Sequence, residues 1–388
     1  MKILFLSYYF EPDLSAGSFR ATALIKELQR QLPPNSRIDV VTTQPNRYHS
    51  YTQDSEQVER RDSVTVHRVK LPEHKNGFVD QALTFRHYAK FVQSVAKCKS
   101  YDLVVGTSSR LMTAVLASYM ARKLKAKLFL DIRDIFVDTI SDVFPKYITS
   151  WAVPVFGLLE RYAVRRADTV NLVSEGFRPY FKLKYPKTNF IFFTNGIDEV
   201  FVNYPWTKHL QQKSPQVILY AGNMGDSQGL HFIVPKLAER LGDSYQFKLI
   251  GDGGKRALLE EKVRVAGLSN VEILPPVKRD ALLEEYSKAD ILFLHLNDVP
   301  AFEKVLPSKV FEYGATGKAI LAGVSGYAAD FIRENLSGAA VFEPCDAEAA
   351  YDAVRALSAD SLTDRTHFVQ TFSRVSISRE LAQQILVT

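Results

Sequence analysis

The chain has 388 residues, of which 46% are hydrophobic and 24% are charged. This length exceeds the size at which one hydrophobic core stops growing, and the composition is that of a globular protein, so we expect two folded domains. The two cysteines, Cys98 and Cys345, lie far apart and in no metal-ligand spacing, which argues against a disulfide framework and a structural zinc site.

The first half alternates short β-rich runs with helical patterns, which is typical of a parallel sheet covered by helices on both faces. Strands are predicted over residues 2–7, 37–43, 64–70, 102–107, 127–134, 169–174 and 189–196. Helices are predicted over residues 20–31, 80–97, 113–124, 148–166 and 178–183.

The same alternation restarts after a polar stretch, residues 208–216. Strands are predicted over residues 216–225, 245–253, 271–276, 290–296, 318–323 and 339–344, with helices that include 254–266 and 279–288. The final helical segment, 372–387, has no strand after it, and we expect it to pack back on the first domain. The prediction is an α/β protein with two doubly wound, Rossmann-like domains facing across a cleft, with a linker near 203–214. The first domain comprises residues 1–205 plus 370–388 and the second comprises 206–369.

The formal charge of +6 is unevenly distributed. Residues 1–205 hold 29 Lys and Arg against 20 Asp and Glu, whereas residues 206–388 hold 20 against 23. The basic half suggests an anionic partner, namely nucleic acid, an anionic membrane surface or a phosphorylated acceptor. A scattered, solvating excess of lysine is the alternative. No base-stacking motif accompanies the basic residues, which disfavours nucleic acid.

The opening run reaches Glu11-Pro12-Asp13 too soon for the apolar core of a signal peptide. No stretch approaches the ~18 apolar residues of a membrane span, so we expect a cytoplasmic protein. Residues 78–97 and 147–166 carry apolar stripes edged by cations. Such stripes are either core faces or surfaces that rest on the inner face of an anionic membrane.

The strongest local motif is VLPSKVFEYGATGKAILAG, residues 305–323. Pro307 precedes Ser308, a suitable N-cap for a short helix that begins at Lys309. The start of a helix favours a diphosphate, Lys309 adds a positive charge, and Glu312 could accept hydrogen bonds from two ribose hydroxyls. The alternative is a capped structural helix with a solvated Glu312.

The segment PSKVFEYGATGKAIL resembles the donor-binding signature of the retaining glycosyltransferases of family 4, which have the GT-B double-Rossmann fold. The resemblance is nearest to the subgroup that makes bacterial surface polysaccharides, including N-acetylfucosamine transferases. Further segments that resemble the family, in the right order over nearly the whole chain, are residues 7–24, 193–201, 219–234 and 249–261.

The resemblance implies a donor site in which Glu312 binds the ribose, and Ser308 and Lys309 lie by the diphosphate and sugar. It also implies that the Gly17 backbone faces the diphosphate and that backbone atoms near Val277 read the nucleobase. Any residue with a side chain at position 17 would keep the backbone away from a phosphate. The predicted donor set is completed by Arg20, Asn223, Gly225, Gly251, Lys255 and Pro307. For Arg20, a phosphate and a carboxylate are equally good partners.

The chain departs from the family pattern at three places. Many members have two glutamates eight positions apart, but Lys304 stands eight positions before Glu312, and Glu303 is out of register. The loop 222–229 lacks the basic residues common in the family, and a common histidine is missing from residues 104–110. Phosphate charge must then be met by Lys309, backbone amides and Arg20 or Lys255.

The acceptor side is predicted at the end of the run LDIRDIFVD. Asp134 could orient or deprotonate an acceptor hydroxyl, and Arg133 could bind an acceptor phosphate, with Arg110 as a further acceptor ligand. The alternative is an Asp134 that caps a helix and pairs with Arg133. Asp134, Lys309 and Glu312 are the predicted catalytic residues. His87 and His295 are taken as structural.

No Asp-x-Asp follows a strand, so neither a metal ion nor another cofactor is expected. The resemblance implies retaining transfer of a hexose or N-acetylaminosugar from a UDP-sugar to a saccharide or polyprenyl-diphosphate-linked acceptor. Polysaccharide, lipopolysaccharide, O-antigen or capsule synthesis is the expected setting.

Other function classes remain as alternatives. A UDP-sugar 2-epimerase would need several acidic and histidine residues in the cleft. A nicotinamide-dependent oxidoreductase would need GxGxxG directly after its first strand, where residues 7–17 are nearly free of glycine. The third alternative is a non-catalytic nucleotide-binding protein.

Overall fold

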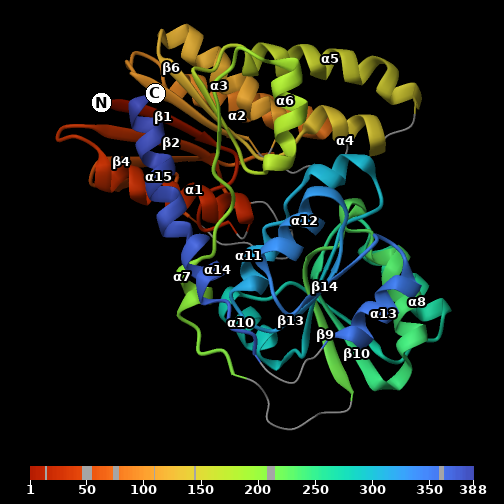
Figure 1. The fold of residues 1–388 in the computed structure, drawn as a ribbon. Helices are drawn as coiled ribbons and strands as arrows, with labels where there is room; N and C mark the ends of the chain where they lie inside the picture. The colour runs from red at the N-terminus through yellow and green to blue at the C-terminus, as the bar shows by residue number, and fades with distance from the viewer. Residues whose placement is uncertain are drawn as a thin grey trace. The chain divides into compact units, whose positions relative to one another are not determined.

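The computed structural model describes the chain apart from Leu14, Ser109 and residues 46–54, 73–77, 144–145, 208–214 and 358–361. The chain forms two compact units (Figure 1). The N-terminal unit comprises Met1–Asn195 and Arg374–Thr388, and the C-terminal unit comprises Gly196–Ser373.

The N-terminal unit contains an eight-stranded sheet in the order β3-β4-β2-β1-β5-β6-β7-β8. All neighbouring strands are parallel except β3 and β4. The strand order reverses at β1, which lies between β2 and β5, and ligands of doubly wound sheets bind at the carboxyl ends of strands at such a point. The strands are β1 (Lys2–Ser7), β2 (Arg37–Thr43), β3 (Val58–Arg61), β4 (Val64–Val69), β5 (Leu103–Ser108), β6 (Lys127–Ile132), β7 (Thr169–Leu172) and β8 (Phe190–Phe192).

Helices cover this sheet, and the last helix of the chain is one of them (Figure 1). Helix α15 packs on α1, and its buried residues Leu381, Ala382 and Ile385 join the core formed by β1, β2 and β5. The C-terminal segment therefore folds with the first half of the chain, as predicted. The helices are α1 (Ala16–Gln31), α2 (Phe78–Val95), α3 (Leu111–Leu124), α4 (Phe136–Val143), α5 (Lys146–Val164), α6 (Arg178–Lys184) and α15 (Arg374–Val387).

The C-terminal unit contains a six-stranded parallel sheet in the order β11-β10-β9-β12-β13-β14. These strands are β9 (Gln216–Asn223), β10 (Tyr245–Asp252), β11 (Val271–Leu274), β12 (Ile291–His295), β13 (Ala319–Gly323) and β14 (Ala339–Phe342). The helices are α7 (Glu199–Val202), α8 (Leu230–Leu241), α9 (Arg256–Val265), α10 (Arg279–Lys288), α11 (Lys309–Gly314), α12 (Gly326–Asn335), α13 (Ala347–Ala356) and α14 (Thr366–Thr371).

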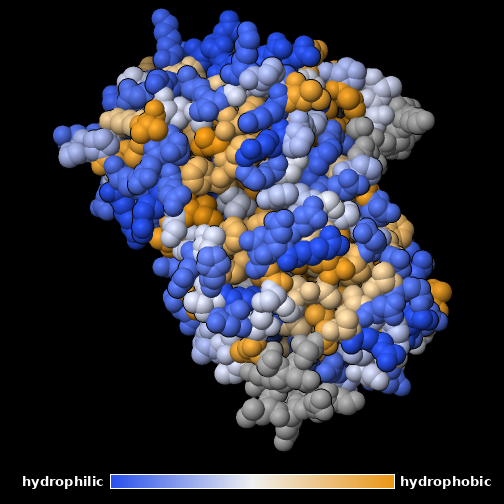
Figure 2. Space-filling model, in the orientation of Figure 1, coloured by the Kyte–Doolittle hydropathy of each residue, from blue (hydrophilic) through white to orange (hydrophobic). Residues whose placement is uncertain are grey.

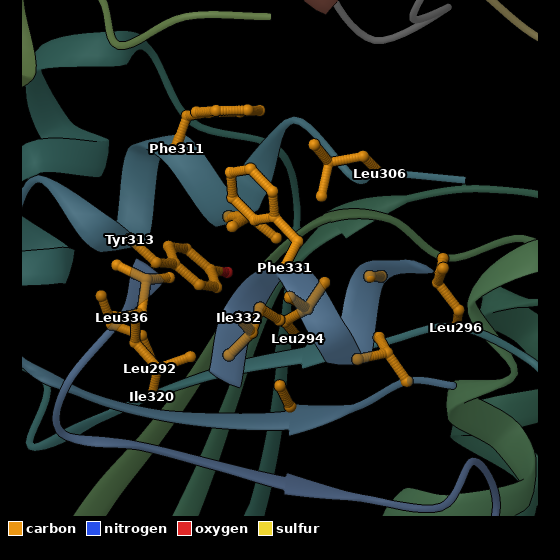
Figure 3. Packing of buried hydrophobic residues seen from close by; sticks show 14 of the residues in the cluster. Leu292, Leu294, Leu296, Leu306, Phe311, Tyr313, Ile320, Phe331, Ile332 and Leu336 are labelled. Carbon is orange, nitrogen blue, oxygen red and sulfur yellow. The ribbon is translucent and has the colours of Figure 1, made fainter. Parts of the chain in front are cut away.

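Helix α11 is held in the core of the C-terminal unit by two aromatic residues, Phe311 and Tyr313 (Figure 3). Phe311 packs against Phe331 of α12 with ring centroids 5.8 Å apart, and Tyr313 packs near Leu292 of β12. Both side chains are fully buried. Burial of this kind fixes the orientation of α11, and with it the positions of Lys309 and Glu312 on the same helix.

Strand β3 and helix α4 are among the elements that were not predicted. Strand β3 is a short polar edge strand, VERR, that pairs antiparallel with β4 through a turn at Asp62, so it carries no apolar run for the pattern to detect. Helix α4 falls just after β6, over residues for which no element was predicted. Helix α1 begins at Ala16, four residues earlier than predicted, because the Ser15 side chain accepts the Ser18 amide as an N-cap. Gly17 therefore lies in the first turn of a helix.

The two units divide at Asn195/Gly196 and Ser373/Arg374, where the sequence suggested 205 and 370. Ile197 forms an isolated parallel bridge with Ser373, and its amide donates to the Phe372 carbonyl at 2.8 Å. Phe201 is buried in the core of the C-terminal unit. Residues 196–205 therefore fold with the second half of the chain. Most of the predicted linker, 208–214, lies outside the described residues.

Within the described ranges, no helix is long and apolar enough to cross a membrane.

Candidate functional site

The candidate donor site is at the carboxyl ends of β9 and β10, where two glycines meet. Gly222 and Gly251 are register partners, and their φ values are 157° and 153°. A Cβ atom on Gly251 would overlap the Gly222 carbonyl oxygen, so position 251 has no space for a side chain. Gly251 therefore permits a close approach of the two strand ends.

Lys309, the first residue of α11, extends over Gly222. A Cβ atom on Gly222 would lie 2.6 Å from Cε and 3.5 Å from Nζ of Lys309. The ammonium group is also 3.5 Å from Oε2 of Glu312, and both side chains are mostly buried. A positive charge is therefore held at the end of β9, in a partly dehydrated environment where its electrostatic effect on a bound anion is stronger than in water.

The Glu312 carboxylate is oriented by α10. The Tyr286 hydroxyl donates to Oε2 of Glu312 at 3.0 Å, and burial beside this carboxylate raises the pKa of Tyr286 well above its ordinary value. Tyr286 thus remains protonated and continues to donate. Its ring is perpendicular to that of Tyr313, whose hydroxyl accepts the Ala221 amide of β9 at 3.4 Å. The carboxylate is thereby held in a fixed position relative to the end of β9.

The predicted N-cap role of Ser308 is wrong. Ser308 has helical dihedrals, φ −60° and ψ −24°, and its side chain makes no capping hydrogen bond. The chain enters α11 through a turn in which the Val310 amide donates to the Pro307 carbonyl at 3.1 Å. Because the backbone is already helical at Ser308, its hydroxyl is not directed at the first amides of α11.

The loop after β9 is organised by its own side chains. Asn223 donates through Nδ2 to Oε1 of Gln228 at 2.7 Å, and the Gly225 amide donates to the same oxygen at 3.3 Å. Lys255 forms an ion pair with Asp226 at 3.1 Å. Sequence reasoning named Asn223, Gly225 and Lys255 as donor ligands, and the structure places all three in or beside this loop.

Two further positions were considered from the sequence, Val277 as a donor contact and Glu303 as a glutamate out of register with the family pattern. Glu303 is exposed, and its backbone carbonyl packs where a Cβ on Gly326 would lie. Val277 is partly buried against the core of the C-terminal unit. Neither position contacts Glu312 through any bond among the described residues.

In the N-terminal unit, Arg20 binds Asp131 and so takes the carboxylate partner of the two that the sequence left open. Arg20 Nε lies 2.9 Å from Oδ2 and Nη2 lies 3.0 Å from Oδ1, with both side chains buried. The same guanidinium donates to the carbonyls of Phe193 and Thr194. Arg20 thus joins α1, β6 and the chain after β8.

Asp131 accepts from two more side chains, Thr107 at 3.1 Å and Asn171 at 2.7 Å. Burial acts to raise the pKa of Asp131, but Arg20 and Asn171 outweigh it and hold this pKa below its ordinary value. The carboxylate is therefore ionised and fully engaged in the interior. This network was not predicted from the sequence.

Arg133 follows β6 directly and lies against the first turn of α1. A Cβ atom on Gly17 would overlap Nη1 of Arg133. Burial lowers the pKa of Arg133 to about 10, and its Nε is buried with no hydrogen-bond partner among the described residues. Asp134 is exposed and close enough to favour the charged form of Arg133. The structure therefore brings Gly17, Arg133 and Asp134 together.

Arg110 is at the N-cap position of α3, after β5, and makes no side-chain cap. Its guanidinium carbon lies 4.4 Å from the ring centroid of Tyr8, and Nη2 donates to the Tyr9 hydroxyl at 3.0 Å. Tyr8 and Tyr9 follow β1, so this cation–π contact lies where the strand order reverses. The aromatic pair directly after the first strand was a signal that sequence reasoning did not use.

The structural role predicted for His295 is confirmed. Its Nδ1 is 2.7 Å from the Gln228 carbonyl, and its Nε2 accepts the Cys345 amide at 3.0 Å. Because an amide can only donate, Nε2 is unprotonated and the ring is neutral with its proton on Nδ1. Burial lowers the pKa of His295 to about 4, which keeps it neutral.

Over the part of the chain that the structure describes, no three His, Cys, Asp or Glu side chains come together as metal ligands. The independence from metal ions stays a prediction.

Both halves of the chain match glycosyltransferase family models. Residues 207–371 match "Glycosyl transferases group 1", and residues 18–196 match "Glycosyl transferase 4-like domain". A curated relative, "Putative colanic acid biosynthesis glycosyl transferase WcaI" of Escherichia coli K12, is 30% identical over 176 residues. That alignment spans 44% of this chain and 43% of the relative, which is less than half of its length.

Solved structures resemble the whole chain. The crystal structure of Anabaena Alr3699/HepE in complex with UDP and glucose has a TM-score of 0.70 and 16% identity, and all of both chains is covered. The lipopolysaccharide outer core galactosyltransferase WaaB, in its apo form, has a TM-score of 0.63 and 14% identity, with 100% of this chain and 99% of that chain covered. These structures show that the fold is that of the GT-B glycosyltransferases, as predicted, and the family matches support a glycosyltransferase.

Proposed function

We propose that this chain, whose two halves match glycosyltransferase family models, transfers a sugar from a UDP-sugar in polysaccharide or lipopolysaccharide biosynthesis. The acceptor is a saccharide or a polyprenyl-diphosphate-linked sugar. UDP is favoured because a structural neighbour was crystallised with UDP and glucose. Transfer of a hexose or N-acetylaminosugar with retention, without a metal ion, extends the resemblance of the 305–323 segment to family 4.

One observation carries the proposal: Glu312 and Lys309 are held together beside Gly222 at the end of β9. A carboxylate whose Oε2 is oriented by Tyr286 can accept hydrogen bonds from the two hydroxyls of a ribose. A lysine ammonium next to it can bind the diphosphate. The pair therefore supplies complementary contacts for the two halves of a nucleoside diphosphate.

The same pair suits the chemistry of transfer. The bond between the anomeric carbon and the phosphate oxygen breaks, and a new bond forms from that carbon to the acceptor oxygen. In the front-face route, the departing phosphate oxygen takes the acceptor proton. Lys309 stabilises the negative charge that develops on the leaving diphosphate, which is the largest electrostatic demand of the step.

The acceptor side of the proposal uses Asp134, Arg133 and Arg110. Asp134 is exposed directly after β6, where it can accept a hydrogen bond from an acceptor hydroxyl and orient it. Arg110 is already engaged with Tyr8 and Tyr9, so it shapes this end of the sheet through a rigid stack. A bound acceptor would then contact an Arg110 side chain that Tyr8 and Tyr9 hold in place.

A peripheral membrane contact is proposed for the face formed by α5 and α6. Val155, Leu158 and Leu183 are 47%, 63% and 85% exposed. The exposed cations around them are Arg161, Arg165, Lys182, Lys184 and Lys187. Hydrophobic side chains gather over α5 beside strongly hydrophilic ones (Figure 2). Apolar side chains surrounded by cations can insert into and bind the surface of an anionic bilayer. A lipid-linked acceptor would be held in that bilayer, at the inner membrane face.

For α2, the core-face alternative holds instead. Phe85, Tyr88 and Val92 are buried, and α2 packs on β2 and β4. Only Leu83, at 56% exposure, is a large exposed hydrophobic residue among the described part of this helix. The proposed membrane face therefore excludes α2.

The experiment that tests the donor site compares nucleotide binding in the wild-type chain and in Glu312→Ala. Thermal unfolding is followed with UDP, GDP, ADP, CDP and dTDP, since ligands that bind only the folded state raise stability. We expect UDP to give the largest shift and Glu312→Ala to lose most of it. Glu303→Ala, an exposed glutamate nearby, is the matched control and should retain the wild-type shift.

An equal UDP shift in Glu312→Ala and in wild type would refute the ribose role. An assay of sugar transfer to an acceptor distinguishes a glycosyltransferase from the alternative proteins that bind the nucleotide but transfer no sugar. A non-catalytic binding protein would show the UDP shift and no loss of UDP-sugar, whereas a 2-epimerase would convert the UDP-sugar without releasing UDP.

A further inference from the structure

Lys318, in the 305–323 motif, is a lysine buried in the interior of the C-terminal unit. Lysine is rarely buried, because removing an amino group from water is costly unless the group makes good hydrogen bonds. Its Nζ donates to the Ala289 carbonyl at 2.7 Å. Ala289 is the C-cap residue of α10, so the lysine binds a carbonyl at the end of that helix, where no further helical turn can do so.

Thr316 makes the corresponding contact at the end of α11. Its hydroxyl and its amide both donate to the Tyr313 carbonyl, at 2.8 and 3.1 Å. The same hydroxyl accepts the Lys318 amide at 3.1 Å. Thr316 is buried, and its hydroxyl is engaged both as a donor and as an acceptor. The end of α11 is therefore joined through Thr316 to Lys318, and through Lys318 to the end of α10.

Gly317 makes this connection possible. Its φ of 69° is in the left-handed region, and a Cβ atom there would lie 2.8 Å from the Thr363 carbonyl oxygen. The bend at this glycine brings the Lys318 amide within hydrogen-bond distance of the Thr316 hydroxyl. Residues 316, 317 and 318 are called the 316–318 link below.

The 316–318 link lies close to the two residues that form the candidate ribose site. Tyr286 is in the last turn of α10, shortly before Ala289, and Glu312 directly precedes Tyr313 in α11. The Tyr286 hydroxyl donates to Oε2 of Glu312 at 3.0 Å. Because a side-chain hydrogen bond is lost by about 3.6 Å, a relative shift of the two helices by roughly half an ångström would break it.

We infer that Thr316 and Lys318 are positioning residues for the donor site. They join the ends of α10 and α11 and so keep the Tyr286 hydroxyl within hydrogen-bond distance of Glu312. Both side chains are buried, and they act on the nucleotide through Tyr286 and Glu312. The inference rests on the proposed function, in which Glu312 binds the ribose of UDP.

The test measures UDP binding to the full-length chain by titration calorimetry. Thr316→Val retains the shape of the side chain and removes the hydroxyl, whereas Thr316→Ser retains the hydroxyl. We expect Thr316→Val to weaken UDP binding about threefold to tenfold, the effect of one neutral hydrogen bond, and Thr316→Ser to restore it. Thr113→Val is the matched control, because Thr113 is a buried threonine of α3 whose hydroxyl has no partner among the described residues. It should bind UDP as wild type does.

Lys318→Met tests the contact with α10. Methionine retains an unbranched side chain but leaves the Ala289 carbonyl without the lysine donor. We expect UDP binding to weaken at least tenfold, the effect of a hydrogen bond from an ammonium group. The titrations are made at a temperature at which each variant is folded, so a loss of stability alone would leave the affinity unchanged. Wild-type UDP affinity in both Thr316→Val and Lys318→Met would overturn the inference.

A double variant with Tyr286→Phe shows whether the 316–318 link acts through the Tyr286 hydroxyl. In that background the hydrogen bond to Glu312 is already absent, so Thr316→Val should cause no further loss of UDP affinity. Additive losses would contradict the positioning role. A wild-type chain that does not bind UDP would contradict the proposed function instead. In that case, coupling between Thr316→Val and Tyr286→Phe in the free energy of unfolding would still support the link, and its absence would overturn it.

Discussion

The Arg20 guanidinium binds both carboxylate oxygens of Asp131 in the interior of the N-terminal unit, at 2.9 and 3.0 Å. The pair joins the start of α1 to the end of β6, and both elements carry predicted site residues: Gly17 of the donor site on α1, and Arg133 of the acceptor side after β6. Because Arg20 also donates to the Phe193 and Thr194 carbonyls, the same pair positions the chain just before the N-terminal unit ends. Asp131 is fully buried, so it is a positioning residue for the site.

The first prediction concerns this pair. Asp131→Asn should leave the Arg20 charge buried without a counterion and lower the unfolding free energy by about 3–5 kcal/mol, the cost of breaking a buried pair. Urea unfolding followed by circular dichroism measures the change. Asp62→Asn removes an exposed aspartate and should change stability by less than about 0.5 kcal/mol. Equal unfolding free energies in the two variants would mean that the Arg20–Asp131 pair does not stabilise the folded protein.

The second prediction concerns the hydroxyl that orients Glu312. Tyr286→Phe retains the buried ring and removes the donor to Oε2 of Glu312. Loss of one hydrogen bond to a charged group should weaken UDP binding by about 1.5–3 kcal/mol, with the unfolding midpoint of the free protein little changed. Calorimetric titration with UDP checks this, with Tyr351→Phe as a control for a partly buried tyrosine of α13 that donates no bond to Glu312. Wild-type UDP affinity in Tyr286→Phe would rule out the orienting role.

The third prediction concerns the space beneath Lys309. Gly222→Ala places a methyl group 2.6 Å from Lys309 Cε, at a φ of 157° that alanine adopts with strain. The lysine should be displaced, and both UDP affinity and the rate of transfer should fall at least tenfold. Gly157→Ala in α5, where nothing lies within 4 Å of the new atom, should leave both unchanged. The idea fails if the two alanine variants behave alike.

The fourth prediction concerns pH. The pKa of His295 is about 4 in the folded protein and near 6.5 when unfolded, so its contribution to stability is complete above pH 6.5. As the pH falls from 6.5 to 4, the unfolded state binds the proton more readily and this contribution is lost, by up to about 3 kcal/mol. Urea unfolding at a series of pH values should show a smaller slope between pH 6.5 and 5 for His295→Gln than for wild type. Equal slopes would contradict a neutral, buried His295.

The fifth prediction concerns the face formed by α5 and α6. Leu158→Glu should reduce co-sedimentation with phosphatidylglycerol vesicles, because it introduces a charge of the same sign as the lipid at a 63% exposed position. Val265→Glu on α9, exposed by 73%, is the matched control in the C-terminal unit. Binding of wild type should also fall in phosphatidylcholine vesicles and in high salt. If Leu158→Glu sediments as wild type does, this face is not a membrane contact.

Local patterning in the sequence was sufficient to predict the two doubly wound domains. Buried parallel strands have continuous apolar runs, so residues 2–7 and 37–43 were predicted with the bounds that the structure has. Helix α10 was likewise predicted over 279–288. The 305–323 motif also indicated Lys309 and Glu312 as neighbours, because residues three apart on a helix lie on one face.

The tertiary structure alone decided which residues far apart in sequence become partners. Arg20 had two equally good partners by chemistry, and the pairing with Asp131, 111 positions away, depends on how α1 packs against β6. The contacts of Glu312 with Tyr286 and of Arg133 with Gly17 also join separate elements. Ser308 is a residue type that favours the N-cap position, but it makes no capping hydrogen bond because the backbone is already helical where the chain enters α11. Residue type determines which bonds a side chain can make, whereas packing of the elements determines which of those bonds form.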